Sequence, residues 1–222
     1  MFRIKICGVK TSDDVDQIAR SGADAVGLNF FPKSIRYLQP ESSDAQQISD
    51  IAGELSITRV GVVVNQTLQE LESLISTVAL DAIQLHGDEP TETATQWSQL
   101  GLPVIRAIKL PTGELAPNTI EEKCEAWLDA GCHPLFDADA GTAHGGSGKT
   151  LHWQSIRSWS EKNPGQPFTL AGGLHSGNLL AALAQSGAKS VDTASGAEEP
   201  RGQKNENKIK QFVDAFNRQL TP

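Results

Sequence analysis

The chain has 222 residues, of which 38 % are hydrophobic and 21 % are charged, and its formal net charge is −8. These values are ordinary for a soluble globular protein with a sizeable core, and the negative charge argues against nucleic-acid binding, which needs a basic face. No apolar run approaches the ~20 residues that span a bilayer, and the N-terminus lacks a signal-peptide core. The three cysteines have no C-x-x-C spacing and fit reduced thiols, so we expect a cytoplasmic protein without membrane or nucleic-acid partners.

Short apolar runs rich in β-branched residues alternate along the chain with longer amphipathic segments. Several of these longer segments begin with Ser, Thr or Asp and end with Gly, which is typical of helix caps. The alternation therefore predicts strands that are each followed by a helix. The predicted strands are, in chain order, 2–7, 24–30, 58–64, 81–85, 103–108, 133–137, 167–171 and 189–194.

Strands that alternate with helices indicate a parallel sheet covered by helices. Eight such units favour a single (β/α)₈ TIM barrel with a parallel eight-stranded core, and we expect residues 1–222 to form one catalytic domain. An open, doubly wound sheet is the alternative, because periodicity does not by itself prove that the sheet closes.

Polar residues stand where most of the predicted strands end, which is the edge of a barrel where active sites lie. Cys7 ends the first strand; it is either a small apolar residue of the wall or a base or nucleophile. Asp137 ends the apolar run of the sixth strand, where burial would keep its carboxyl protonated and able to act as a general acid. We also expect Gln84, His86 and Asp192 to contact a substrate, although a purely structural role for His86 is nearly as good an interpretation.

Turns that contain glycine follow the seventh and eighth predicted strands. Gly172 and Gly173 precede a segment that can begin a helix, and Ser195 and Gly196 form a second turn. Backbone N–H groups in such turns and at helix N-termini bind anions, and β/α barrels often bind phosphate here. Each turn alone could be only a tight turn, but together they predict a small phosphorylated substrate.

One basic loop and several histidines are candidates for other kinds of site. Lys33 and Arg36 follow the second predicted strand, either as a solvated loop or with the guanidinium binding a carboxylate, a geometry that suits Arg better than Lys. The histidines lack paired ligands at short spacing, so we expect no metal.

The segment Ala143–Thr150, AHGGSGKT, ends like a nucleotide-binding phosphate loop. That pattern requires glycine where Ala143 stands, and the segment follows the sixth predicted strand instead of the first strand of its domain. We therefore favour a lid over the site, spanning residues 138–148, and leave the role of Lys149 open.

Seven segments together resemble one enzyme family, phosphoribosylanthranilate isomerase. They occur in the family's order over nearly the full length, and the combination of KICG with GGSGK is specific. The segments are KICGVKTSDDV, GADAVGLNFFPKSIRYL, RVGVVVN, IQLHGDE, LFDADAGTAHGGSGKTLHW, LAGGLHSGN and VDTASGAE.

The resemblance implies a (β/α)₈ barrel that isomerises N-(5′-phosphoribosyl)anthranilate in tryptophan biosynthesis, an Amadori rearrangement without cofactor or metal. It implies Cys7 as general base, Asp137 as general acid and Arg36 as the residue that binds the anthranilate carboxylate. The phosphate positions that it implies are Gly172, Gly173, Ser195 and Gly196.

Two rival functions remain at this point. A related aminoaldose isomerase would use carboxylates for both catalytic roles, which Cys7 disfavours, and a phosphate-binding protein would lack catalysis altogether. The stretch 197–207 is more polar than the family pattern, so the resemblance says least about the rim of the phosphate site. The low aromatic content of 5 % favours a monomer over a homodimer.

Overall fold

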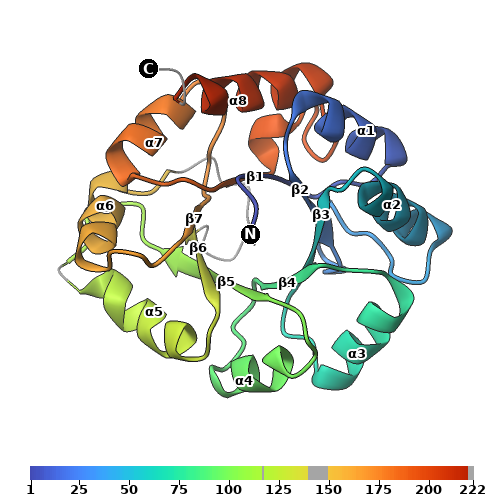
Figure 1. The fold of residues 1–222 in the computed structure, drawn as a ribbon, viewed down its shortest axis with the longest axis horizontal. Helices are drawn as coiled ribbons and strands as arrows, with labels where there is room; N and C mark the ends of the chain where they lie inside the picture. The colour runs from blue at the N-terminus through green and yellow to red at the C-terminus, as the bar shows by residue number, and fades with distance from the viewer. Residues whose placement is uncertain (117, 140–149, 220–222) are drawn as a thin grey trace.

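The computed structural model describes residues 1–116, 118–139 and 150–219. Within these residues eight parallel strands form one closed barrel, in the order β1 to β8, and Figure 1 shows them at the centre of a ring of helices. The strands are β1 (Ile4–Cys7), β2 (Ala25–Asn29), β3 (Thr58–Val63), β4 (Ala82–Leu85), β5 (Val104–Leu110), β6 (His133–Ala138), β7 (Thr169–Leu170) and β8 (Val191–Thr193).

Each strand of the barrel is followed by a helix on the outside. The helices are α1 (Ser12–Ser21), α2 (Ser43–Glu54), α3 (Leu68–Thr77), α4 (Glu92–Ser98), α5 (Thr119–Asp129), α6 (Trp153–Lys162), α7 (Leu179–Ser186) and α8 (Glu206–Arg218), with a 3₁₀ turn, η1 (Ser195–Ala197), after β8.

The first and last strands are hydrogen-bonded neighbours, and this pairing closes the sheet. The register between β1 and β8 places Lys5 opposite Asp192 and Ile6 opposite Thr193. The predicted (β/α)₈ barrel is therefore confirmed and the open sheet is ruled out. All eight predicted strands occur, but β7 is only Thr169–Leu170, whereas β5 continues to Leu110, beyond its predicted end.

Capping boxes begin two of the helices. Thr11 accepts a hydrogen bond from the backbone N–H of Asp14, whose carboxylate accepts one from Thr11 in return, and this capping box begins α1. Thr67 and Glu70 repeat the arrangement at α3. Gly22 ends α1 in the left-handed conformation that glycine adopts most easily.

Side chains on each strand alternate between two cores. Ile4 and Ile6 belong to the large cluster between the barrel and the helices, so Lys5 and Cys7 point into the barrel. The barrel interior contains a smaller apolar cluster, and above it lie the inward-facing polar residues. The members of the smaller cluster are Phe2, Ala25, Val60, Ala82, Ile105, Ala107, Leu135 and Ala171.

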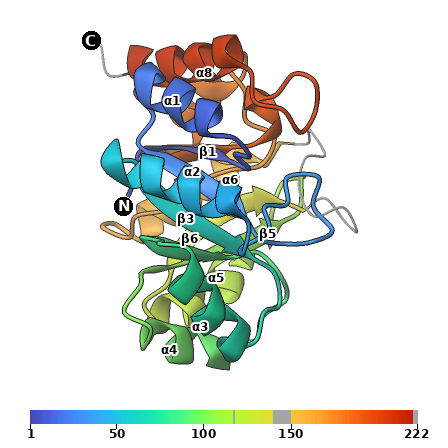
Figure 2. The same ribbon diagram turned by 90° about the vertical axis from the view of Figure 1, so that its right-hand side faces the viewer.

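The segments that follow β2 and β8 lie on one side of the barrel. Figure 2 shows the chain after β2, in blue, and the chain after β8, in red, on the same side of the barrel, opposite the N-terminus. No helix within the described part of the chain combines the length and the apolar character that crossing a membrane requires.

Candidate active site

A cavity opens at the carboxyl ends of the strands, on the side that barrel architecture predicts. Nine of the ten predicted site residues line it, and the tenth, Gly196, lies in an adjoining hollow. The nine are Cys7, Arg36, Gln84, His86, Asp137, Gly172, Gly173, Asp192 and Ser195.

A buried ion pair adjoins this cavity, because one of its two residues, Asp192, lines it. Lys5 has no exposed surface, and its Nζ atom lies 2.7 Å from Oδ1 of Asp192 on the neighbouring strand. Burial lowers the pKa of Lys5, but Asp192 and Cys7 together raise it above its usual value, so the ammonium stays charged. Lys5 was not predicted as a site residue. The sequence does contain a signal for it, because a lysine two residues before Cys7 in an apolar strand must lie on the same face as Cys7 and needs an anionic partner.

Cys7 lies beside this pair, at the end of β1. Burial raises the pKa of its thiol, and the ammonium of Lys5 has the largest opposing effect. Gly27, its register neighbour on β2, leaves the space that the sulfur needs, because a Cβ there would come within 2.7 Å of Sγ. The site thus holds the thiol tightly and places a cation against it.

Asp137 lies near the carboxyl end of β6 on its inward face, and its carboxyl has a raised pKa. Burial raises its pKa to about 7, the nearby Asp192 carboxylate adds to the rise, and the N–H of Ala138, which donates to Oδ1 at 2.9 Å, opposes it. A carboxyl with this pKa is protonated in a large fraction of molecules near neutral pH, as a general acid must be.

A histidine and a glutamine orient the acid. The side-chain amide of Gln84 lies 3.2 Å from Nδ1 of His86, and an amide N–H that donates there pairs with the tautomer that carries its proton on Nε2. That nitrogen is 3.5 Å from Oδ2 of Asp137. The predicted residues Gln84, His86 and Asp137 therefore lie together, with an imidazole nitrogen of His86 facing the carboxyl of Asp137.

The two predicted phosphate turns form one continuous rim. Gly172 and Gly173 both have positive φ, and a Cβ on Gly172 would come within 2.6 Å of the backbone nitrogen of Ala138. The adjoining hollow is bounded by Gly173, Ser195 and Gly196, and the structure adds Lys208 to it. Backbone donors with a cation nearby suit a phosphate.

Arg36 lines the same cavity but has a partner that the sequence analysis did not predict. Its Nε and Nη2 atoms donate to the carboxylate of Glu198, at 2.6 and 2.8 Å. The guanidinium is 7 % exposed and the carboxylate 1 %. One of the two interpretations of the sequence, that Arg36 belongs to a solvated basic loop, is therefore wrong.

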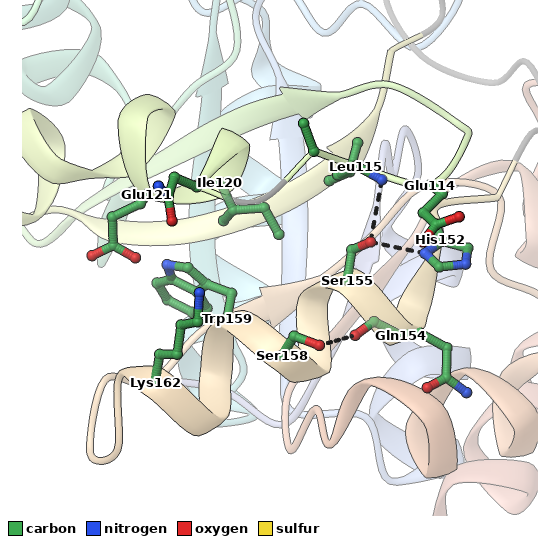
Figure 3. A pocket seen from close by; sticks show the side chains of 12 residues that line it. Glu114, Leu115, Ile120, Glu121, His152, Gln154, Ser155, Ser158, Trp159 and Lys162 are labelled. Carbon is green, nitrogen blue, oxygen red and sulfur yellow. Dashed lines mark hydrogen bonds between the residues drawn. The ribbon is translucent and has the colours of Figure 1, made fainter.

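A second cavity lies in the outer ring, between the chain before α5 and helix α6 (Figure 3). Its polar groups bind one another: Ser155 accepts from the N–H of Leu115 and pairs with Nδ1 of His152. The indole nitrogen of Trp159 is buried without a partner in the described chain. This cavity contains none of the strand-end residues, so we place the chemistry in the barrel.

Two predictions concern groups that the structure does not test. No cluster of three His, Cys, Asp or Glu in the described chain could hold a metal ion, and the absence of a metal and of a cofactor remains a prediction. Residues 140–149, which include Lys149 and most of the predicted lid, lie outside the described residues.

Comparison with known proteins shows which family the chain belongs to. The model of the family "N-(5′-phosphoribosyl)anthranilate (PRA) isomerase" matches residues 4–215. The chain belongs to this family. The resemblance that its sequence motifs predicted is therefore confirmed, and the chain is an isomerase by family.

Individual phosphoribosylanthranilate isomerases are similar to this chain over nearly their whole length. That of Cereibacter sphaeroides is 36 % identical over 219 residues, which cover 96 % of this chain and 97 % of the relative. A crystal structure of the Thermotoga maritima enzyme has 34 % identity and a TM-score of 0.81, covering 98 % and 99 % of the two chains. Another structure of the family (32 % identity, TM-score 0.79, 98 % and 99 % coverage) is a complex with reduced 1-(o-carboxyphenylamino)-1-deoxyribulose 5-phosphate.

The raised pKa of Asp137 predicts a pH-dependent stability difference in Asp137→Asn. At low pH the carboxyl is protonated in folded and unfolded chains alike, but between its unfolded pKa and about 7 only the folded chain keeps the proton, so stability falls as pH rises. The difference between 3.8 and about 7 corresponds to roughly 4 kcal/mol. Asp137→Asn should be more stable than the parent at pH 8, by up to this amount, and should lose the advantage near pH 4.

Urea unfolding at the two pH values measures this effect. Asp214→Asn, at an exposed position of α8 far along the chain from the site, is the control and should change stability equally at both. An Asp137→Asn advantage that does not depend on pH would show that the carboxyl is not held protonated by the fold.

Proposed function

We propose that this chain converts N-(5′-phosphoribosyl)anthranilate into 1-(2-carboxyphenylamino)-1-deoxyribulose 5-phosphate, with Asp137 as general acid and Cys7 as general base. The observation that carries the assignment is one cavity that holds both groups: a carboxyl with a pKa of about 7 and a thiol beside a buried ammonium. The family to which the chain belongs supports the same reaction.

The acid opens the sugar ring. Asp137 donates its proton to the furanose ring oxygen, the bond from that oxygen to C1′ breaks, and the nitrogen lone pair forms a protonated Schiff base with C1′. His86 Nε2, 3.5 Å from Oδ2, then stabilises the carboxylate that Asp137 becomes.

The base then moves a proton along the carbon chain. The cationic imine acidifies C2′, so the Cys7 thiolate takes that proton and the electron pair forms an enolamine. Transfer of the proton from Cys7 to C1′, and of the O2′ proton to Asp137, yields the ketone and returns both groups to their starting forms. The Lys5 ammonium favours the thiolate form on which this step depends.

The two charged ends of the substrate match two parts of the cavity mouth. The glycine turns after β7 and β8, with Gly172, Gly173, Ser195 and Gly196, offer backbone donors to the phosphate. Arg36, from the loop after β2, faces the same cavity and suits the anthranilate carboxylate. An isomerase with two catalytic carboxylates is less consistent with this site, because position 7 is a cysteine.

Catalysis by this pair predicts large losses from single substitutions. Cys7→Ser and Asp137→Asn should each lower kcat by about 10²–10⁴-fold, because each removes one proton-transfer group. The measurements are turnover of phosphoribosylanthranilate and growth of a tryptophan auxotroph. Cys124→Ser, at a buried cysteine of α5 outside the cavity, is the control and should retain activity. Unchanged turnover in both site variants would overturn the acid and base assignment.

We further propose that residues 1–222 act as one cytoplasmic catalytic domain and as a monomer. The three cysteines are free thiols, as in a reducing compartment. A Thermotoga maritima relative, 32 % identical, is described as dimeric, so the assembly must be measured on this chain. Light scattering after size exclusion should give a mass near 23.8 kDa, whereas twice that value at micromolar concentration would establish a dimer.

A further inference from the structure

Glu198 is almost completely enclosed by donors. Its Oε1 atom accepts from Arg36 Nε at 2.6 Å and from Lys204 Nζ at 2.8 Å, and Oε2 accepts from Arg36 Nη2 at 2.8 Å and from the N–H of Gly202 at 2.9 Å. Burial raises the pKa of this carboxyl, but the hydrogen bonds and cations around it outweigh burial and hold the pKa at about 2. The carboxylate is therefore permanently charged and fully engaged.

The contact joins two loops that are distant in sequence. Arg36 belongs to the chain after β2 and Glu198 follows η1 after β8, so the pair spans 162 positions. Figure 2 shows these two segments on the same side of the barrel. Gly8, at the end of β1, lies directly under the guanidinium stem, where a Cβ would clash with Cδ of Arg36. The guanidinium is thus fixed both by its partner and from below.

The geometry leaves one end of the guanidinium available. Glu198 occupies the Nε and Nη2 edge, and Nη1 has no hydrogen-bond partner in the described chain. Arg36 also lines the cavity that holds Cys7 and Asp137. A planar guanidinium held by one edge presents its remaining N–H groups in a fixed direction, which is the arrangement that carboxylate recognition requires.

The charges of the cluster do not cancel. Arg36 and Lys204 are two cations that share one carboxylate, and both have nearly buried side chains. Burial lowers the pKa of Lys204, Glu198 opposes the fall, and the Arg36 guanidinium adds to it. A second carboxylate bound at Arg36 would balance the remaining positive charge.

We propose that Glu198 is a positioning residue that orients Arg36 to receive the aromatic carboxylate of the substrate, with Lys204 holding Glu198 and leaving the cluster one positive charge in excess. This inference rests on the proposed function, because it names the group that Arg36 recognises. It also gives a role to two charged residues of the polar stretch 197–207, Glu198 and Lys204.

The test compares two substrates in Glu198→Gln: phosphoribosylanthranilate, and the same compound made with aniline, which lacks the carboxylate. For the first, KM should rise roughly tenfold to a hundredfold while kcat stays within about threefold, since a charge-assisted contact is lost and the catalytic groups are intact. For the aniline compound, kcat/KM should stay within about threefold of the parent enzyme. Glu199→Gln, at the exposed neighbouring residue, is the control and should leave the ratio of the two kcat/KM values unchanged.

A double variant separates positioning from general structural support. If Glu198 acts through Arg36, Arg36→Met with Glu198→Gln should lose no more activity than Arg36→Met alone. Equal losses on both substrates, or additive losses in the double variant, would overturn the proposal. Should Glu198→Gln not fold by circular dichroism, Glu198→Asp replaces it, with a smaller loss confined to the carboxylate substrate as the expected result and an equal loss on both as the contradictory one. Failure of the parent enzyme to turn over either substrate would instead refute the proposed function.

Discussion

The buried ion pair between Lys5 and Asp192 is the interaction on which the rest of the site depends. An ammonium with no exposed surface is stable only because a carboxylate lies 2.7 Å away, and the pair exists only because β1 and β8 close the barrel. Its two charges act in opposite directions on the residues above it. Lys5 opposes the rise in the pKa of both Cys7 and Asp137, and Asp192 adds to both rises. The pKa values of both groups thus depend on one pair.

The two regions that we propose to bind anions use different kinds of hydrogen-bond donor. The phosphate rim after β7 and β8 consists of backbone N–H groups in glycine turns, which suit an anion with several oxygens. The position that we propose for the substrate carboxylate is a single planar guanidinium held by Glu198. In the proposed reaction, a substrate anchored at both of these positions would have its reacting carbons close to Cys7 and Asp137, which line the same cavity.

Much of the fold and of the site could be predicted from the sequence, because the order of the strands along the chain determines where their ends lie in a barrel. Eight apolar runs predicted eight strands, and the rule that parallel strands end at one edge placed Cys7, Gln84 and Asp137 in a single cavity. The partners of charged residues could not be predicted in this way. Lys5 and Glu198 each pair with a residue more than 150 positions away, and only ring closure and loop packing bring those residues together.

Proton abstraction by Cys7 would depend on the Lys5 ammonium, which opposes the rise in the pKa of the thiol. The most direct measurement is the rate at which iodoacetamide alkylates Cys7 as a function of pH, followed by mass spectrometry in the parent protein and in Lys5→Met. Because only the thiolate reacts, we expect a higher apparent pKa in Lys5→Met and a rate at pH 8 that falls about tenfold for each unit of that increase. An unchanged or lower apparent pKa in folded Lys5→Met protein would contradict it.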